Sequence, residues 1–243
     1  MDSPHHTTTN LFDLSNRLNR LIIFTRYPEL GKNKTRLIPA LEDAMLSPKT
    51  QARATEIHRR LAEHTLAQGR QWLTKQSAGK ITACFTGGDA QSMAAWLGED
   101  LDYHPQGEGD LGQRILFVLE HFRESNLTIE SHRESYIKNY FVVIGTDCPD
   151  LTSEDIDRAF AELSENDLVL GPAEDGGYYL IGFTQIIPQL FQDISWGTAT
   201  VFAETVAIAK NLDLRISYLP VRRDIDRPED LNYLKTLAGF ENI

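Results

Sequence analysis

Residues 140–151, with the sequence YFVVIGTDCPDL, constrain the fold of this chain more than any other segment. The apolar run 141–144 has the pattern of a β-strand that is buried on both faces, which is typical of a parallel sheet covered by helices. The run ends at Gly145, and Asp147 follows two residues later. Ligands of open α/β sheets bind beyond the carboxyl ends of the strands, so Asp147 is positioned to hold a divalent cation against a diphosphate. The alternative is that Asp147 only caps a turn before a helix that begins near Thr152.

Segments typical of strands and of helices alternate along the rest of the chain. Strands are expected at 21–25, 80–86, 101–104, 167–171, 178–183 and 214–219. Helices are expected from Pro48 with Ser47 as the cap, after Asp89, after Asp110, after Thr152, over 198–210 and from about Pro228, whereas the polar residues 124–139 are expected to form a loop insertion. This alternation predicts an α/β fold of three layers, α/β/α, around a mostly parallel mixed sheet. We expect one nucleotide-binding domain over 20–243, preceded by a flexible N-terminal arm over 1–19.

The composition excludes several classes of protein. The chain has 243 residues and a net charge of −11, from 24 basic and 35 acidic residues, which argues against a surface for nucleic acids but not against a nucleotide site. Cys84 and Cys148 do not suggest a disulfide framework, so we expect a cytoplasmic protein. No apolar segment has the roughly 20 residues that a membrane-spanning helix needs.

The loop after the first predicted strand, RYPELGKNKTRL, concentrates positive charge in this acidic protein. It contains Arg26, Lys32, Lys34 and Arg36, and Gly31 allows a tight backbone turn. Such a loop can surround phosphate groups with backbone N–H groups and basic side chains. It is not a Walker A loop, because the pattern GxxxxGK[ST] is absent. The alternative is a solvated basic loop without a ligand.

Two later loops also carry candidate site residues. In GPAEDGGYYLIG, Asp175, Gly176 and Gly177 form a turn of the hairpin type. Asp175 is either a carboxylate of a substrate cleft, with the glycines allowing a ligand close to the backbone, or part of the turn alone. In SWGTAT, Trp196 either stacks on a ligand ring or belongs to the core, and Thr198 is a candidate cap of the next helix.

The segment RRDIDRPEDL follows the last predicted strand and contains Asp224 and Asp226. We expect that only one of these two side chains needs to face a cleft. Helix capping is the alternative role for Asp226, since Pro228 marks the start of a helix.

Five segments together resemble one bacterial family. They are RYPELGKNKTRL, GEGDLGQRI, VVIGTDCPDL, GPAEDGGYYLIGF and DIDRPEDL, in this order within residues 21–235. The family they resemble is that of the radical-SAM/selenodomain-associated transferases, also described as arsenosugar-biosynthesis-type glycosyltransferases. More distantly, the chain is similar to the GT-A nucleotide-diphospho-sugar transferases and to molybdenum-cofactor and phospholactate nucleotidylyltransferases. The resemblance implies the GT-A fold.

The resemblance also implies roles for individual residues. It implies a nucleotide-binding first loop, a metal-binding aspartate that matches Asp147, and a carboxylate after the last strand that matches Asp224 or Asp226. Two departures from the family pattern are visible. Arg227 stands where the family often has threonine, and the DxD form of many glycosyltransferases appears here as DCPD, with Asp147 and Asp150.

We therefore expect a metal-dependent glycosyltransferase that uses a nucleotide-diphospho-sugar donor, a small-molecule acceptor and Mg²⁺ or Mn²⁺. The first alternative is a nucleotidylyltransferase that moves a nucleoside monophosphate from a nucleoside triphosphate to a phosphorylated acceptor. The second is a non-catalytic module that binds a nucleotide-sugar. The expected site residues are Asp147 and Asp175 for catalysis, Arg26, Gly31, Lys34, Thr35 and Arg36 for the nucleotide, Gly176, Gly177 and Trp196 for the substrate, and Asp147 and Asp226 for the metal.

Overall fold

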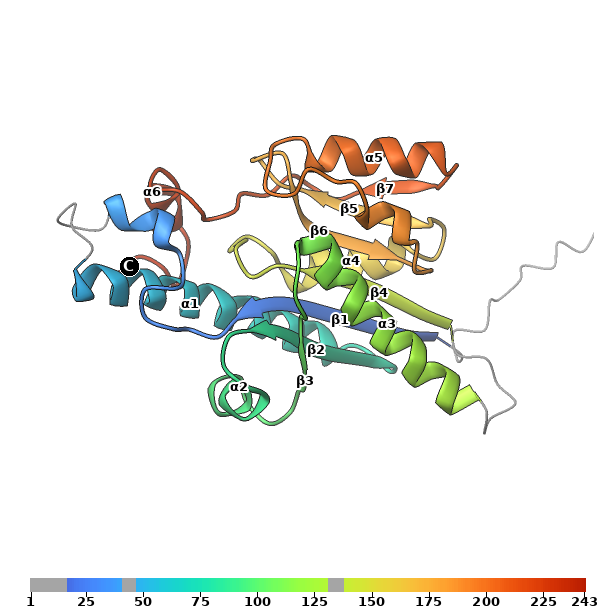
Figure 1. Cartoon of the computed structure of the whole chain (residues 1–243), viewed down its shortest axis with the longest axis horizontal. Helices are drawn as coiled ribbons and strands as arrows, with labels where there is room; N and C mark the ends of the chain where they lie inside the picture. The colour runs from blue at the N-terminus through green and yellow to red at the C-terminus, as the bar shows by residue number, and fades with distance from the viewer. Residues whose placement is uncertain (1–16, 41–46, 131–137) are drawn as a thin grey trace, which may run out of the picture.

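A mixed β-sheet lies at the centre of the computed structural model, which describes residues 17–40, 47–130 and 138–243. In this part of the chain the strand order is β3-β2-β1-β4-β6-β5-β7, and β6 runs antiparallel to its neighbours β4 and β5 (Figure 1). The strands are β1 (Arg17–Arg26), β2 (Gly79–Thr86), β3 (Asp102–Pro105), β4 (Lys138–Ile144), β5 (Leu168–Pro172), β6 (Tyr178–Phe183) and β7 (Ile216–Tyr218). The predicted mostly parallel mixed sheet is confirmed.

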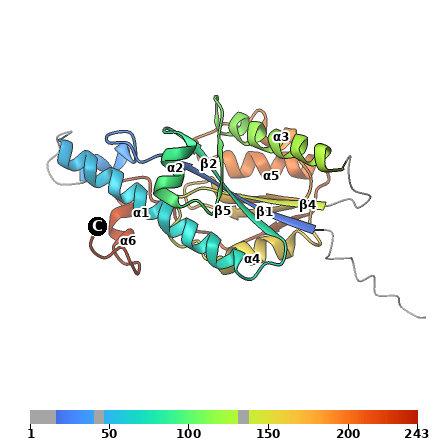
Figure 2. The same ribbon diagram turned by 90° about the horizontal axis from the view of Figure 1, so that it is seen from below.

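Helices cover both faces of this sheet. They are η2 (Thr35–Ala40), α1 (Pro48–Leu73), α2 (Ala90–Leu97), α3 (Leu111–Glu130), α4 (Ser153–Glu162), η3 (Pro188–Phe191), α5 (Val201–Asn211) and α6 (Asp230–Leu234). The buried side chains of α1, α2 and α4 share one hydrophobic cluster with the sheet, and those of α3 and α5 share another (Figure 2). The predicted three layers, α/β/α, are confirmed. None of the described helices is both long and apolar enough to cross a membrane.

The central strands are buried on both faces, as their apolar runs predict. In β1, Leu21 and Ile23 belong to the cluster with α1, whereas Ile22 and Phe24 belong to the cluster with α3. Burying a side chain of this size contributes about 1.5–3 kcal/mol to folding. The alternation along the strand thus joins both helical layers to one rigid sheet.

A third hydrophobic cluster lies beyond the carboxyl ends of the central strands (Figure 1). It joins the first half of α1 to η2, to α6 and to the residues that follow α6, through side chains such as Leu37, Ile57, Leu61, Leu234 and Phe240. Ser47 caps α1 and Pro48 is its first residue, as predicted. This cluster fixes the C-terminal segment beside the loop that leaves β1.

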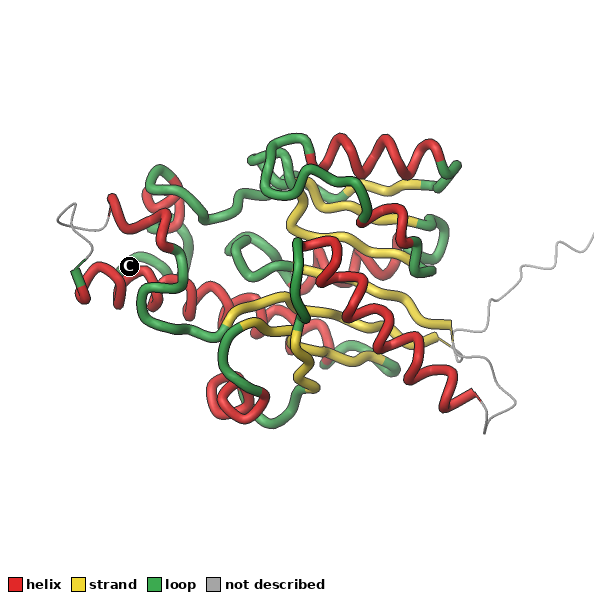
Figure 3. The backbone as a smooth tube through the Cα atoms, viewed as in Figure 1, coloured by secondary structure: helices red, strands yellow, loops and turns green. Residues whose placement is uncertain are grey.

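Several loops meet at one end of the sheet because β1, β2 and β4 are parallel. Arg26 pairs with Thr86 and Ile23 with Ile144, so these three strands end close together. The β5–β6 turn and the segment after β7 reach the same end (Figure 3). The loops that sequence reading selected are therefore neighbours in space.

Several element boundaries differ from the sequence prediction. β1 begins at Arg17, inside the expected arm of 1–19, because pairing with β2 and β4 continues through polar residues such as Asn19. The expected loop over 124–139 is wrong in part, since α3 continues to Glu130 and β4 begins at Lys138. Residues 131–137 of that loop, and 1–16 of the arm, lie outside the described residues. The last strand is shorter than the expected 214–219.

A further difference is the start of α5. This helix begins at Val201, and the Thr198 hydroxyl donates to the Ser195 carbonyl, 2.7 Å away, instead of capping a helix. Residues 195–200 therefore form a separate loop that leads into α5.

Candidate active site

The loop after β1 is held in a compact shape by backbone and amide contacts. Gly31 has a φ of 74°, a left-handed conformation that favours glycine at this turn. The side chain of Asn33 accepts from the N–H of Glu29 at 2.7 Å and donates to the Tyr27 carbonyl at 3.3 Å. Lys34 follows with a φ of 48°, a left-handed conformation that is uncommon outside glycine. The loop thus directs the Lys34 side chain toward the end of the sheet.

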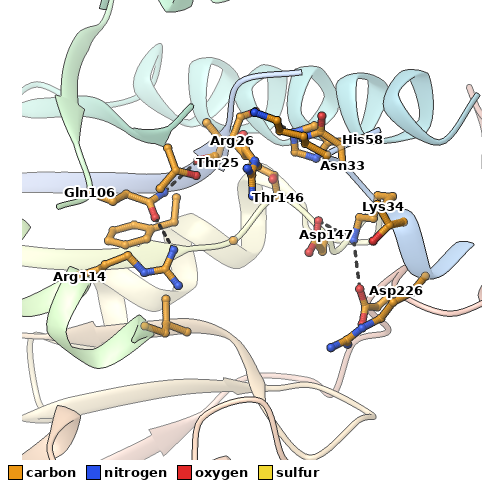
Figure 4. A pocket seen from close by; sticks show the side chains of 17 residues that line it. Thr25, Arg26, Asn33, Lys34, His58, Gln106, Arg114, Thr146, Asp147 and Asp226 are labelled. Atoms are coloured by element: carbon orange, nitrogen blue, oxygen red, sulfur yellow. Dashed lines mark hydrogen bonds and ion pairs between the residues drawn. The ribbon is translucent and has the colours of Figure 1, made fainter. Parts of the chain in front are cut away.

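The Lys34 ammonium group links three segments of the chain. Its Nζ lies 2.8 Å from Oδ1 of Asp147 and 3.9 Å from Oδ1 of Asp226, and it also donates to the Ile225 carbonyl (Figure 4). Only 4% of the Lys34 side chain is exposed. Two carboxylates therefore converge on one cation at the point where the first loop, the end of β4 and the C-terminal segment meet.

Asp226 does not cap a helix. Its Oδ2 accepts from Nη1 of Arg36 at 2.7 Å, and the Arg36 side chain is 73% exposed. The Asp230 carboxylate instead accepts from the backbone N–H groups of Asp226 and Arg227, at 3.1 and 2.8 Å. The alternative role of Asp226 as a cap is therefore wrong, and its carboxylate faces the basic loop.

Asp147 also does not cap the following helix. Thr152 caps α4 in a capping box with Asp155. The backbone carbonyl of Asp147 accepts from the N–H of Ile225 at 2.8 Å, which fastens the C-terminal segment to the end of β4. Asp150, the second acid of DCPD, accepts a hydrogen bond from the Tyr233 hydroxyl. Asp147 is thus left with its carboxylate at the cleft.

A cleft of about 350 Å³ lies between the basic loop and the strand ends; we call it the donor cavity. Among its lining residues are the predicted Arg26, Lys34, Thr35, Arg36, Asp147 and Asp226, together with Thr25, Asn33, His58, Gln106, Leu111, Arg114 and Thr146. Gly31 does not line the donor cavity and acts through the shape of the loop. Five of the predicted nucleotide and metal residues thus face one cleft with Asp147.

Sequence reading missed several polar residues of the donor cavity. His58 lies on α1, and its Nε2 is 2.7 Å from the Arg26 carbonyl; burial lowers the pKa of this imidazole. Gln106 and Arg114 flank the start of α3 and form a hydrogen bond of 3.1 Å with each other. Arg114 belongs to GEGDLGQRI, the one family segment from which sequence reading selected no site residue.

A second cavity of about 260 Å³ adjoins the first; we call it the acceptor cavity. It shares Arg36, Leu111, Asp147 and Asp226 with the donor cavity and is further lined by Asp175, Gly177, Tyr178, Trp196, Gly197, Thr198, Val201 and Asp224. Oδ1 of Asp175 accepts from the N–H of Gly177 at 2.8 Å. Gly176 does not line the cavity, because it packs beneath residues 195–200, where an added Cβ would lie 2.2 Å from the Ala199 carbonyl.

Asp224 lies on the acceptor side of the junction between the two cavities. Burial, and then the negative charges of Asp147 and Asp175, raise the pKa of the Asp224 carboxyl to about 7, and the Lys34 charge opposes this rise. Both Asp224 and Asp226 line the acceptor cavity, as residues two positions apart on one side of an extended segment can, and the N–H of Ile225 between them donates to the Asp147 carbonyl. Only one of them was expected to be needed at the cleft, and the structure brings both there.

The junction has the chemistry of a site for a hard divalent cation. Mg²⁺ is usually held by one or two carboxylates, with water and substrate phosphates completing its ligands. Asp147 and Asp226 converge on the Lys34 cation, so their oxygens fit a site of this kind. Within the described residues no group of three or more His, Cys, Asp or Glu side chains forms a complete metal centre. A cation bound here would need ligands from the substrate.

The fold is shared with solved structures that carry nucleotide-related names. A candidate nucleotide-diphospho-sugar transferase from Desulfovibrio desulfuricans G20 is 29% identical over 92% of this chain and 90% of that one, with a TM-score of 0.71. A 4-diphosphocytidyl-2C-methyl-D-erythritol synthase from Anaerococcus prevotii DSM 20548 is 10% identical over 90% and 95% of the two chains, with a TM-score of 0.52. CMP:2-keto-3-deoxy-manno-octonic acid synthetase in complex with CTP is 11% identical over 92% and 99%, also with a TM-score of 0.52. The predicted nucleotide-diphospho-sugar transferase fold is confirmed.

The family follows from the sequence itself. Residues 70–198 match the family described as "Uncharacterized protein conserved in bacteria (DUF2064)". This match spans more than half of the 243 residues, and the chain belongs to that family. No curated protein matches the chain.

Proposed function

We propose that the protein is a metal-dependent glycosyltransferase that moves a sugar from a nucleotide-diphospho-sugar to a hydroxyl group of a small molecule. The observation that carries this proposal is the charge difference between two cavities that meet at Asp147. The donor cavity brings Lys34, Arg36 and Arg26 to one cleft, whereas the acceptor cavity adds Asp175 and Asp224 and, among the residues that the structure describes, no further basic residue.

The donor cavity suits a nucleoside diphosphate. Lys34 and Arg36 can donate charge-assisted hydrogen bonds to phosphate oxygens. Asp147 and Asp226 would hold Mg²⁺ or Mn²⁺, and the cation would stabilise the charge that develops on the leaving diphosphate. The 29% identical neighbour, with its name as a candidate nucleotide-diphospho-sugar transferase, supports this choice of donor.

The acceptor cavity suits a hydroxyl compound. Oδ1 of Asp175 already accepts a hydrogen bond from the N–H of Gly177, so Oδ2 is available to orient the acceptor hydroxyl and take its proton. The acceptor oxygen then forms a bond to the anomeric carbon, the bond from that carbon to the phosphate oxygen breaks, and its electron pair leaves with the diphosphate. Trp196 lines this cavity, and in the proposal its indole would stack on a ring of the substrate.

A phosphorylated acceptor fits this cavity poorly, which disfavours the nucleotidylyltransferase alternative. Arg36 is the basic residue among the described lining of the acceptor cavity, and it is already paired with Asp226. A phosphate monoester would meet the carboxylates of Asp175 and Asp224 instead. We also propose that residues 20–243 form a single domain and that the protein is one of the radical-SAM/selenodomain-associated glycosyltransferases. We further propose that it acts in the cytoplasm, which the free thiols of Cys84 and Cys148 support.

The test is to incubate the protein and Mn²⁺ with panels of nucleotide-sugars and of nucleoside triphosphates, with neutral and phosphorylated acceptors. Free nucleoside diphosphate and pyrophosphate are scored separately. The proposal predicts nucleoside diphosphate from a nucleotide-sugar, with a faster release when a hydroxyl acceptor is present. Pyrophosphate from a nucleoside triphosphate would favour the nucleotidylyltransferase, and binding without either product would favour a non-catalytic module.

A further inference from the structure

The end of the donor cavity away from Asp226 has polar groups that the diphosphate and the cation do not use. Figure 4 shows Thr25, Gln106 and Arg114 on one side of the cleft, and Lys34 and Asp226 on the other. The acceptor cavity opens at the Asp226 side, where a donor sugar must lie. The nucleoside of the donor therefore extends toward Thr25, Gln106 and Arg114.

Gln106 is held in one orientation by hydrogen bonds. It is 3% exposed, and its Nε2 donates to the carbonyls of Thr25 and Cys84, at 2.9 and 2.8 Å. Both amide hydrogens are thereby used, and a flipped amide would set Oε1 against two carbonyl oxygens. Oε1 accepts from Nη1 of Arg114 at 3.1 Å, so Gln106 positions the guanidinium group of Arg114.

The Arg114 guanidinium group has donors left for a ligand. Its Nε donates to the Asp110 carbonyl at 3.2 Å, and its Nη1 binds Gln106. No ion pair joins Arg114 to a carboxylate within the described residues. Arginine has five N–H donors and no acceptor, so a ligand that meets Arg114 must accept hydrogen bonds.

Thr25 adds an unsatisfied group at the same end. It is 6% exposed and lines the donor cavity, and its Oγ1 has no hydrogen-bond partner within the described residues. Buried hydroxyl groups in folded proteins nearly always have a partner. This oxygen is itself enclosed by the protein, so Thr25 lines the donor cavity with its other atoms and the donors open to a ligand at this end are those of Arg114.

We infer that this end of the donor cavity binds a base with a keto oxygen, guanine or uracil, and discriminates against adenine and cytosine; the inference rests on the proposed nucleotide-sugar donor. Guanine offers O6 and N7 as acceptors, and uracil offers O4 as thymine does. At the corresponding position adenine and cytosine present an amino group, which is a donor and faces the donors of Arg114. Arg114 is thus a specificity-determining residue, and Gln106 positions it.

The test measures the affinities of GDP, UDP, ADP and CDP by calorimetry in Mn²⁺, for the wild-type protein, Arg114→Gln and Arg123→Gln. Arg123 is an exposed arginine on the same helix and pairs with Glu120, so it is a matched control. We expect GDP or UDP to bind the wild type and the control about tenfold or more tightly than ADP and CDP. In Arg114→Gln this preference should fall to about threefold or less, because glutamine can both donate and accept. The GDP and UDP titrations distinguish the two keto bases.

A second variant keeps the test independent of the folding of Arg114→Gln. Arg114→Lys keeps the positive charge but lacks the fixed fork of N–H donors, and it should weaken the preferred nucleotide about threefold to tenfold. Equal affinities of the four nucleotides for the wild type would overturn the inference but not the proposed donor. If Arg114→Gln lost affinity equally for all four nucleotides, Arg114 would bind phosphate, and this result would also overturn the inference. If none of the four binds, the proposed function itself fails.

Discussion

Lys34 is the residue on which the charges of the junction depend. Its ammonium group neutralises part of a carboxylate cluster that contains Asp147, Asp226 and, more distantly, Asp224. Arg36 makes a similar ion pair from a side chain that is largely in solvent. The two basic residues should therefore share a role in binding but differ in their contribution to stability.

Lys34→Met and Arg36→Ala should each weaken the binding of a nucleoside diphosphate by about 1–3 kcal/mol, the value of a charge-assisted hydrogen bond. An exposed ion pair contributes about 0–1 kcal/mol to folding, so Arg36→Ala should leave the melting temperature almost unchanged. Lys34→Met should lower it, because the carboxylates then repel one another without compensation. Calorimetry and thermal denaturation measure both effects, with the exposed Arg59→Ala as control. This assignment would be contradicted if the control variant bound the nucleotide more weakly than the wild type, or if Lys34→Met bound it as tightly as the wild type.

Asp224 should make the stability of the ligand-free protein depend on pH. Its folded pKa of about 7 lies above the usual carboxyl value, so the folded protein keeps a proton that the unfolded chain releases. The contribution of Asp224 to the free energy of unfolding is thus fully present at low pH and is lost as pH rises toward 7. Asp224→Asn should remove this loss and raise the free energy of unfolding at pH 8 by on the order of 2–4 kcal/mol, with little effect at pH 4.

Denaturant titrations in a chelator at pH 4, 6 and 8 measure this pH dependence. Asp213→Asn, at an exposed residue after α5, is the control and should have the same small effect at each pH. If Asp224→Asn were no more stabilising at pH 8 than at pH 4, the carboxyl would be ionised in the folded protein without penalty.

At the scale of elements, the acceptor cavity depends on how the β5–β6 turn packs against residues 195–200. Gly176 has a φ of 90°, and its carbonyl accepts from the N–H of Phe202 at 2.9 Å, which joins the turn to the start of α5. Gly197 has a similar φ of 79° on the other side of the cavity, but nothing lies within 4 Å of a Cβ added there. Substitutions at the two glycines can therefore distinguish the cost of backbone strain from the cost of a steric overlap.

Gly197→Ala should destabilise the protein by about 1–2 kcal/mol, the value for a left-handed alanine. Gly176→Ala should lose on the order of 1–3 kcal/mol more, because its Cβ would overlap the Ala199 carbonyl. Thermal denaturation measures both variants. Equal losses would show that the turn does not pack tightly against residues 195–200.

Sequence patterns predicted the elements better than their ends. The strand over 141–144 and the Ser47 cap were visible because apolar runs and capping residues are local signals. The continuation of α3 to Glu130 was missed because its polar residues resemble a loop when their neighbours are unknown. The role of Thr198 was missed because the choice between a helix cap and a loop depends on the contact with Ser195.

At the scale of the whole molecule, the site joins residues far apart in the chain. The basic loop, Asp147 and Asp226 were predictable because each follows a strand and parallel strands end together. That both Asp224 and Asp226 line the acceptor cavity was not predictable, because it depends on how Ile225 fastens this segment to Asp147. The roles of Gln106 and Arg114 were not predictable, because a tertiary hydrogen bond brings these two side chains together.

The most direct test of the account is the effect of Asp147→Asn on cation-dependent nucleotide binding. The change keeps the shape of the side chain and removes the charge that would hold the cation. Calorimetry would measure the affinity of the preferred nucleoside diphosphate with Mn²⁺ and with a chelator, for the wild type and the variant. We predict that Mn²⁺ strengthens binding to the wild type by about tenfold or more and that this gain disappears in Asp147→Asn, with an unchanged circular dichroism spectrum. A full gain from Mn²⁺ in the folded variant would contradict the role of Asp147.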